Sequence, residues 1–189
     1  EIVHAAPEWM FDQYAHARLR ASDDSVAHSQ NWVSAAVGGA PGLCLDNDDV
    51  RARAERFLTA LVTRYRNHPA AWAWDLANEH SAQGGTPAKM YCFCEATQAK
   101  FRTWLKAKHG SLEKLREAWG RYSYATWENV HPPRSFSGYA ESLDWLEFRN
   151  DNHFAERQWR TDLVRRLDPR NRITAHGVAG TLEGLARAA

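Results

Sequence analysis

The stretch that decides the fold runs from His68 to Glu79 and reads HPAAWAWDLANE. Its centre, residues 71–77, is short and mostly apolar, which is typical of a strand covered on both faces in a parallel sheet. The proline near its start ends the preceding helix, because the residue before a proline avoids the helical region. We therefore expect Glu79 at the carboxyl end of a buried parallel strand.

Helices and short strands alternate on both sides of this stretch. Residues 2–6 and 172–176 are predicted to be two further strands. Residues 21–45, rich in Ser, Asp, Gly and Ala, predict a long loop. Helical spacing of apolar residues predicts helices from Val50 to Tyr65, over 91–109, from Ser111 to Trp119 and over 142–167.

Strands separated by helices indicate an α/β fold with a parallel sheet. A complete eight-stranded barrel needs roughly 250 residues. The chain has 189 residues and three candidate strands. We expect residues 1–189 to be an internal piece of one catalytic barrel domain, a partial TIM (β/α)8 barrel.

The composition excludes several classes of function. The formal net charge is +1, so no strong field favours nucleic acid or an anionic membrane. No stretch approaches the roughly 20 apolar residues of a membrane span. Three cysteines are a poor disulfide framework and favour a reducing compartment, so we expect a cytoplasmic protein. The nine tryptophans fit either core packing or stacking on sugars.

Glu79 is the candidate for acid/base chemistry, because active sites of parallel barrels lie at the carboxyl ends of the strands. Glycoside hydrolysis needs two carboxylates, one of which must stay protonated near neutral pH. Apolar surroundings raise a carboxyl pKa, and Trp72, Trp74 and Leu76 are expected to supply them. Asn78 could hydrogen-bond a sugar hydroxyl. The alternative is that Glu79 is an ordinary surface glutamate.

Several segments together resemble family 42 of the glycoside hydrolases, which contains β-galactosidases. They occur in the family's order and rough spacing: residues 68–79, then 91–94 (YCFC), 101–105 (FRTWL), 110–120 ending in EAWG, and 127–134 (WENVHPPR). The resemblance covers most of residues 1–177. It implies that residues 2–6, 71–77 and 172–176 are the third, fourth and fifth barrel strands, with a long helical insertion after the fourth.

The resemblance also implies roles for individual residues. The family's acid/base glutamate closes the fourth strand and corresponds to Glu79, and the substrate-binding Asn before it corresponds to Asn78. His80 and Trp127 are further candidates for substrate binding. The family's nucleophile closes the seventh strand, so it is expected outside this chain. Loop 37–43 lacks the arginine with which many members reach the sugar, which leaves the sugar specificity open.

Cysteines provide a second link to the family, many members of which hold a structural zinc. Cys44, Cys92 and Cys94 fall where three of the four ligands are expected, and Thr97 stands at the fourth. Structural zinc sites are nearly always four-coordinate, and threonine is a poor ligand. Two hypotheses follow: a zinc site whose fourth ligand is a histidine or water, or a degenerate site with free thiols.

Two classes of function remain open. The first is a retaining glycosidase acting on terminal β-D-galactosides or on a related β-glycoside such as an arabinopyranoside, with a carbohydrate as its only substrate class and no cofactor required for catalysis. The second is a non-catalytic carbohydrate-binding or scaffold barrel of the same descent. The isolated chain is expected to be inactive, because it holds one carboxylate of the pair. The resemblance also implies a homotrimer.

Overall fold

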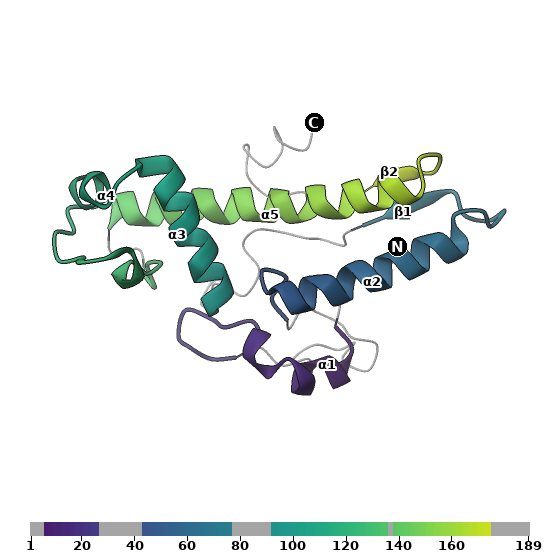
Figure 1. Ribbon diagram of the computed structural model, residues 1–189, viewed down its shortest axis with the longest axis horizontal. Coiled ribbons are helices and arrows are strands. Elements are labelled where there is room, and N and C mark those ends of the chain that lie inside the picture. Colours follow the sequence, from purple (N-terminus) through teal and green to yellow (C-terminus); the bar gives the residue numbers. More distant parts are fainter. Residues whose placement is uncertain (1–5, 27–42, 77–91, 136–137, 175–189) are drawn as a thin grey trace.

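One long helix organises the molecule. The computed structural model describes residues 6–26, 43–76, 92–135 and 138–174. In Figure 1, helix α5 (Tyr139–Leu167) runs along the long axis, and the other elements pack beside it. Its N-terminal half contacts α3 (Glu95–His109) and α4 (Leu112–Trp119), whereas its C-terminal half contacts α2 (Asp48–Tyr65). Among the described residues, no helix is long and apolar enough to cross a membrane.

Strands β1 (Ala73–Asp75) and β2 (Arg172–Thr174) form a parallel pair. Their register aligns Trp74 with Ile173, and the Leu76 amide extends the ladder by donating to the Thr174 carbonyl at 2.9 Å. The prediction that residues 71–77 and 172–176 contain neighbouring parallel strands is confirmed, although β1 begins at Ala73 rather than at 71. Residues 2–5 of the first predicted strand lie outside the described residues.

Helix α2 begins and ends where its sequence predicts. The Asn47 side chain accepts hydrogen bonds from the Asp49 and Val50 amides, which satisfies two of the free N–H groups at the start of the helix. The helix ends three residues before His68-Pro69. Val50, Leu58 and Val62 are buried, whereas Phe57 is 58% exposed because it points about 100° away from Leu58 around the helix.

The predicted insertion after β1 is confirmed: α3, α4, the 3-10 turn η4 (Trp127–Asn129) and α5 all lie between the two strands in the chain. Gly110 and Gly120 follow α3 and α4 with φ angles of 78° and 63°. Only glycine adopts this region without strain, so these residues terminate their helices. Helix α3 begins at Glu95 rather than near 91, and α5 begins at Tyr139 rather than 142.

Three hydrophobic clusters form the core. The insertion cluster joins α3, α4 and α5 around Phe101, Leu115 and Trp145. The strand cluster joins α2, β1 and α5 around Val62, Trp74 and Val164. A third cluster packs α1 (Glu8–Gln13) and the 3-10 turn η1 (Ala15–Ala17) on the start of α2. Helix α5 belongs to the first two, so it carries both the insertion and the strands.

One sequence-based expectation is wrong. Trp72 does not form part of the apolar surroundings of the strand: it is 71% exposed, and the Arg172 guanidinium lies over its ring at 5.5 Å. It precedes β1, and no strand among the described residues covers it. The described ends of the predicted loop 21–45 contain no helix or named strand, and they take part in two isolated bridges, Arg18 with Leu43 and Arg20 with Val26. Helix α1 is an element that the sequence analysis does not predict.

Candidate functional site

The predicted catalytic residue follows β1 in the chain. Leu76 is the last described residue there, and its amide pairs with β2. Asn78, Glu79 and His80 follow it directly in the chain, but residues 77–91 lie outside the described residues. The parallel pair fixes the direction in which the chain leaves the strand. The assignment of these three residues to the site therefore stays a prediction.

A hydrogen-bond network around Asp168 connects β1 to the segment between α5 and β2. The Trp74 indole N–H donates to Asp168 Oδ2 at 2.8 Å, and Asn171 Nδ2 donates to the same oxygen at 2.7 Å. Burial raises the pKa of Asp168, but the hydrogen bonds from Trp74 and Asn171 outweigh this effect and lower it to about 2. Asp168 thus stays ionised and links the end of α5 to β1.

Arg160, on α5, reaches the carboxyl end of β1. It is 4% exposed, and its guanidinium donates to the Leu76 carbonyl at 3.3 Å and to Glu156 Oε1 at 2.7 Å. This contact lies three residues before Glu79 in the chain. Neither Asp168 nor Arg160 is identified from the sequence. Both are charged residues on α5 or directly after it. No local sequence pattern distinguishes such a buried charge from a charge on the surface.

Three cysteine sulfurs meet between α2 and α3. The Sγ atoms of Cys44, Cys92 and Cys94 all lie within 4.8 Å of one another. Cys44 and Cys94 are buried and Cys92 is half-buried. The expectation that these residues cluster is confirmed. The cluster brings together two segments that are about 50 residues apart in the chain. Cys44 precedes α2, and Cys94 is the residue directly before α3.

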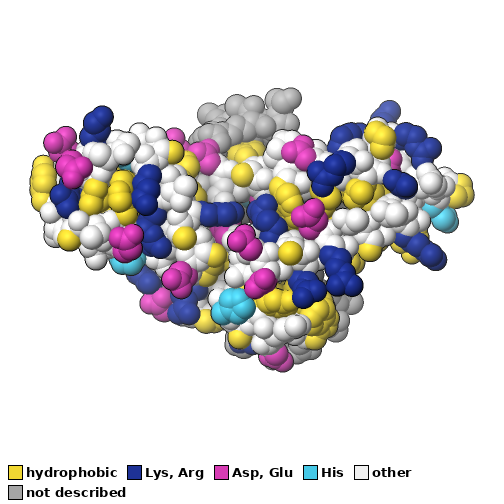
Figure 2. All heavy atoms as spheres, viewed as in Figure 1, with side chains coloured by type: hydrophobic (Ala, Val, Ile, Leu, Met, Phe, Trp, Pro, Cys, Tyr) yellow, Lys and Arg dark blue, Asp and Glu magenta, His cyan; other side chains and the backbone are white. Residues whose placement is uncertain are grey.

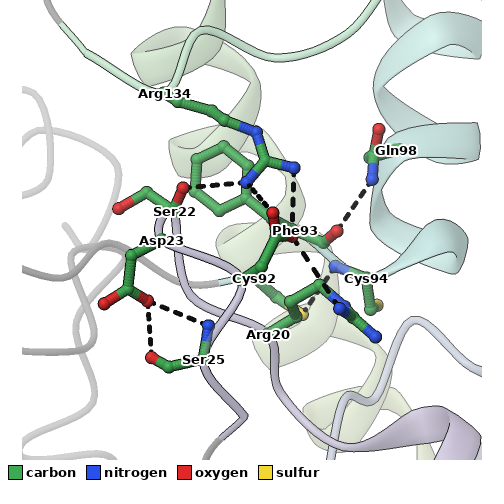
Figure 3. Close-up of polar contacts among 10 residues, drawn as sticks. Arg20, Ser22, Asp23, Ser25, Cys92, Phe93, Cys94, Gln98 and Arg134 are labelled. Atoms are coloured by element: carbon green, nitrogen blue, oxygen red, sulfur yellow. Dashed lines mark hydrogen bonds and ion pairs between the residues drawn. The ribbon is translucent and has the colours of Figure 1, made fainter.

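Backbone contacts keep the cysteines in place. The Cys44 amide donates to the Ala17 carbonyl at 2.7 Å, and the Phe93 amide donates to the Arg20 carbonyl at 2.8 Å. The Cys94 amide donates to Cys92 Sγ at 3.3 Å. Figure 3 shows Phe93 between the two cysteines, with the Arg134 guanidinium over its ring at 5.8 Å. Backbone contacts therefore help to bring the three cysteines, which form no disulfide, to one place.

The three thiols differ in how readily they ionise. Hydrogen bonds from the other two cysteines lower the pKa of Cys94, and hydrogen bonds to its neighbours raise the pKa of Cys44. The hydrogen bond with Cys44 lowers the pKa of Cys92, but the bond to Cys94 and burial outweigh this and raise it. Cys94 is therefore the sulfur that ionises most readily. Three thiol groups this close together are suitable ligands for a divalent metal, so the cluster could hold a metal such as zinc.

Thr97 lies beside the sulfurs, at the position where the sequence places the fourth ligand. Its Oγ1 is 3.2 Å from Cys44 Sγ and 3.3 Å from Cys94 Sγ, and the residue is 3% exposed. The hydroxyl donates to Asp46 Oδ2 at 2.7 Å. Among the described residues, no histidine reaches the cluster, so the expected histidine replacement is not found there.

The sequence does not predict that Asp46 binds Thr97, because its position before a helix favours a capping role. In the structure, Asn47 caps α2 instead. Besides Thr97, it accepts hydrogen bonds from Lys100 Nζ at 2.7 Å and from Asn152 Nδ2 at 3.0 Å. Lys100 follows Thr97 by one helical turn, a spacing that places both on one face of α3. That spacing is the only sequence signal for this network.

Trp127 lies in the insertion. It is half-buried against the insertion cluster, with Lys106 Nζ 5.5 Å from the ring centroid. These contacts are those of a packing residue, and the predicted substrate contact stays a prediction.

On the face drawn in Figure 2, basic and acidic side chains are interspersed.

Comparison with known proteins identifies the family. The family model for glycoside hydrolase family 42, described as beta-galactosidase, matches residues 3–185. The β-galactosidase bgaB of Geobacillus kaustophilus is 28% identical over 155 residues, covering 77% of this chain and 21% of its own length. BgaP of Planococcus sp. (strain L4) is 29% identical over 185 residues, covering 91% of this chain and 25% of its own.

Solved structures agree with these sequence matches. The crystal structure of β-galactosidase from Bacillus circulans sp. alkalophilus matches with a TM-score of 0.72 at 25% identity, over 92% of this chain and 25% of that protein. Gan42B, a GH42 β-galactosidase, matches with a TM-score of 0.74 at 27% identity, over 94% and 25%. The chain thus spans about a quarter of the length of these relatives. It belongs to glycoside hydrolase family 42.

Proposed function

We propose that the full-length protein is a retaining glycoside hydrolase that removes terminal β-D-galactosyl groups. Glu79 is its acid/base residue, Asn78, His80 and Trp127 bind the substrate, and the nucleophilic carboxylate lies outside this chain. The curated relatives named above are called β-galactosidases, which supports this choice of sugar.

The parallel pair β1–β2 is the observation that carries the proposal. Hydrogen bonding between the strands continues to Leu76, three residues before Glu79. In barrels of parallel strands the catalytic groups follow the carboxyl ends of the strands. The contact between Arg160 and the Leu76 carbonyl supports it further, because a buried guanidinium restrains the backbone just before the catalytic residue.

The chemistry follows from the position of one carboxylic acid. Glu79 donates its proton to the glycosidic oxygen while the missing carboxylate attacks the anomeric carbon from the opposite side. It then accepts a proton from the water that hydrolyses the glycosyl-enzyme. The net configuration is retained because the anomeric carbon is inverted twice.

A structural zinc at Cys44, Cys92 and Cys94 is part of this proposal. Zinc bound there would supply a cross-link between the segment before α2 and the start of α3, and no catalytic step needs it. The three thiol groups and the backbone contacts around them fit such a site. A homotrimer, which the family resemblance implies, remains an expectation.

The test uses Glu79→Gln in the full-length enzyme. Turnover of an unactivated β-galactoside is expected to fall by about 10²-fold or more, the usual contribution of a general acid. The first step on an activated aryl galactoside is slowed much less, because the leaving group needs no proton. The second step still needs a base to activate water, so the glycosyl-enzyme accumulates. Azide attacks that intermediate without deprotonation and restores turnover with a β-galactosyl azide product.

Glu117→Gln is the matched control, because Glu117 is exposed on α4. It should leave both substrates unaffected. Small, equal losses for both substrates at Glu79→Gln, without rescue by azide, would show that another carboxylate is the acid/base.

A further inference from the structure

Thr97 Oγ1 lies beside two of the three sulfurs, at distances close to those between the ligands of a tetrahedral zinc. Zn–S bonds of about 2.3 Å and Zn–O bonds of about 2.1 Å require S···O edges of about 3.6 Å and S···S edges of about 3.8 Å in a tetrahedron. Thr97 Oγ1 lies 3.2 Å and 3.3 Å from two of the sulfurs, and the sulfurs lie within 4.8 Å of one another. Both S···O distances are about 0.3–0.4 Å shorter than the tetrahedral value, so a bound zinc needs the Thr97 oxygen to move outward only slightly from these two sulfurs.

We propose that Thr97 is itself the fourth ligand, so that this chain binds zinc through three thiolates and one hydroxyl oxygen. This inference rests on the zinc assignment above and is independent of the role of Glu79. The thiols of Cys44, Cys92 and Cys94 release their protons to solvent on binding, whereas the Thr97 hydroxyl keeps its proton. Asp46 makes that distinction possible.

Asp46 orients the hydroxyl for binding. The single hydroxyl hydrogen of Thr97 is directed at Asp46 Oδ2, 2.7 Å away, so the oxygen lone pairs face the sulfurs. Lys100 and Asn152 hold the carboxylate from the other side. A hydrogen bond to a carboxylate increases the electron density on the donor oxygen, as second-shell carboxylates do for metal-bound histidines. A weak ligand is thereby strengthened and fixed in place.

Charge balance favours three thiolates over four. A divalent cation with three thiolates carries one negative charge, and the buried Arg149 guanidinium is close enough to Cys92 to interact with it electrostatically. Asp46 is balanced by Lys100, at 2.7 Å. The neutral Thr97 hydroxyl adds no further charge to this set, whereas a fourth thiolate would add a negative one.

X-ray absorption at the zinc edge of the full-length protein tests the ligand set. Three sulfur neighbours at about 2.3 Å and one oxygen at about 2.1 Å are expected for the wild type. Four sulfur neighbours in Thr97→Cys would show that residue 97 points at the metal. An oxygen neighbour that persists in Thr97→Val, with unchanged affinity, would identify the fourth ligand as water or Asp46 and overturn the proposal.

Metal affinity provides the second measurement, with zinc alone as the probe and a chelator as competitor. Thr97→Val, which has nearly the same shape, is expected to weaken zinc binding by about 10-fold or more, the usual effect of losing a metal-site contact. Asp46→Asn should weaken it by a smaller factor, because the ligand remains but is less well oriented. Thr103→Val, an exposed residue on the same helix, is the matched control and should bind as the wild type does.

The two proposals fail in different ways. If purified protein binds no zinc and Thr97→Val unfolds like the wild type, the metal assignment is wrong while the role of Glu79 is untouched. If Asp46→Asn abolishes binding and Thr97→Val does not change it, the carboxylate is the ligand and the inference about Thr97 fails. Galactosidase activity measured on the same samples reports separately on the catalytic proposal.

Discussion

Replacing Asp144 with asparagine is expected to loosen the junction of α3, α4 and α5. Asp144 is 6% exposed and accepts hydrogen bonds on Oδ2 from the Trp119 indole at 2.8 Å and from His109 Nε2 at 2.7 Å. Its other oxygen pairs with Lys108 Nζ at 2.9 Å. Each of these three neighbours is therefore a hydrogen-bond donor; Lys108 and His109 end α3, and Trp119 ends α4.

The asparagine amide can satisfy only part of this set. If the amide oxygen faces Trp119 and His109, the amide NH₂ group faces the Lys108 ammonium. If the amide is turned over, the NH₂ group faces the indole N–H of Trp119 instead. In either case a buried donor is left without an acceptor, at a cost of about 1–3 kcal/mol, and the charge that strengthened the remaining bonds is lost. We expect the insertion to be destabilised by about 2–3 kcal/mol relative to the wild type.

Hydrogen exchange in the full-length protein measures this effect locally. Amides of α3 and α4 should exchange about 30- to 150-fold faster in Asp144→Asn, the factor that corresponds to 2–3 kcal/mol. Glu147→Gln is the control, because Glu147 also pairs with Lys108 but is 45% exposed, and exposed pairs contribute little. A change below about 5-fold in Asp144→Asn, or an equal change in Glu147→Gln, would refute the idea that Asp144 organises the junction.

Three further outcomes are expected. The lowered pKa of Asp168 means that its ionised form stabilises the folded state; this stabilisation is complete above about pH 4 and is lost as the pH falls towards about 2, so an acid titration should lose this component in Asp168→Asn. Arg160→Met should destabilise β1 by about 3 kcal/mol, because it removes the buried guanidinium that donates to the Leu76 carbonyl and to Glu156, as hydrogen exchange of β1 will show. Leu115→Ala should cost about 2–5 kcal/mol in denaturant unfolding because Leu115 is fully buried, whereas the exposed Leu143→Ala should cost less than about 0.5 kcal/mol.

Local signals in the sequence are sufficient to predict most of the fold. Helix α2 is recognisable because apolar spacing, an Asn cap and a following His-Pro all agree on its limits. Strands β1 and β2 are recognisable as apolar runs, but the start of β1 is predicted two residues too early, since a strand begins where its partner starts to pair and not where its apolar residues begin. Helix α1 escapes prediction because six residues carry too little periodicity.

The candidate site is predictable to a smaller degree. The three cysteines can be grouped because thiols at the family's spacing are typical of a shared metal site, and the structure brings them together. The network of Asp46, Lys100 and Asn152 cannot, because charged and amide side chains are common on surfaces and their partners lie more than 50 residues away. Tertiary contacts of this kind have no local signature in a single sequence.

The distance along the chain between the paired strands has a kinetic consequence. Ala73 aligns with Arg172, so pairing β1 with β2 closes a loop of about 100 residues, at an entropic cost of about 4 kcal/mol if the intervening chain is unstructured. The helices between them make mostly local contacts and can form within microseconds to milliseconds. Once α5 is helical, its 29 residues form a rod of about 43 Å that carries β2 back along α2 towards β1. The insertion thus acts as a folding scaffold, and damage to it should slow the joining of the two strands more than it weakens the finished pair.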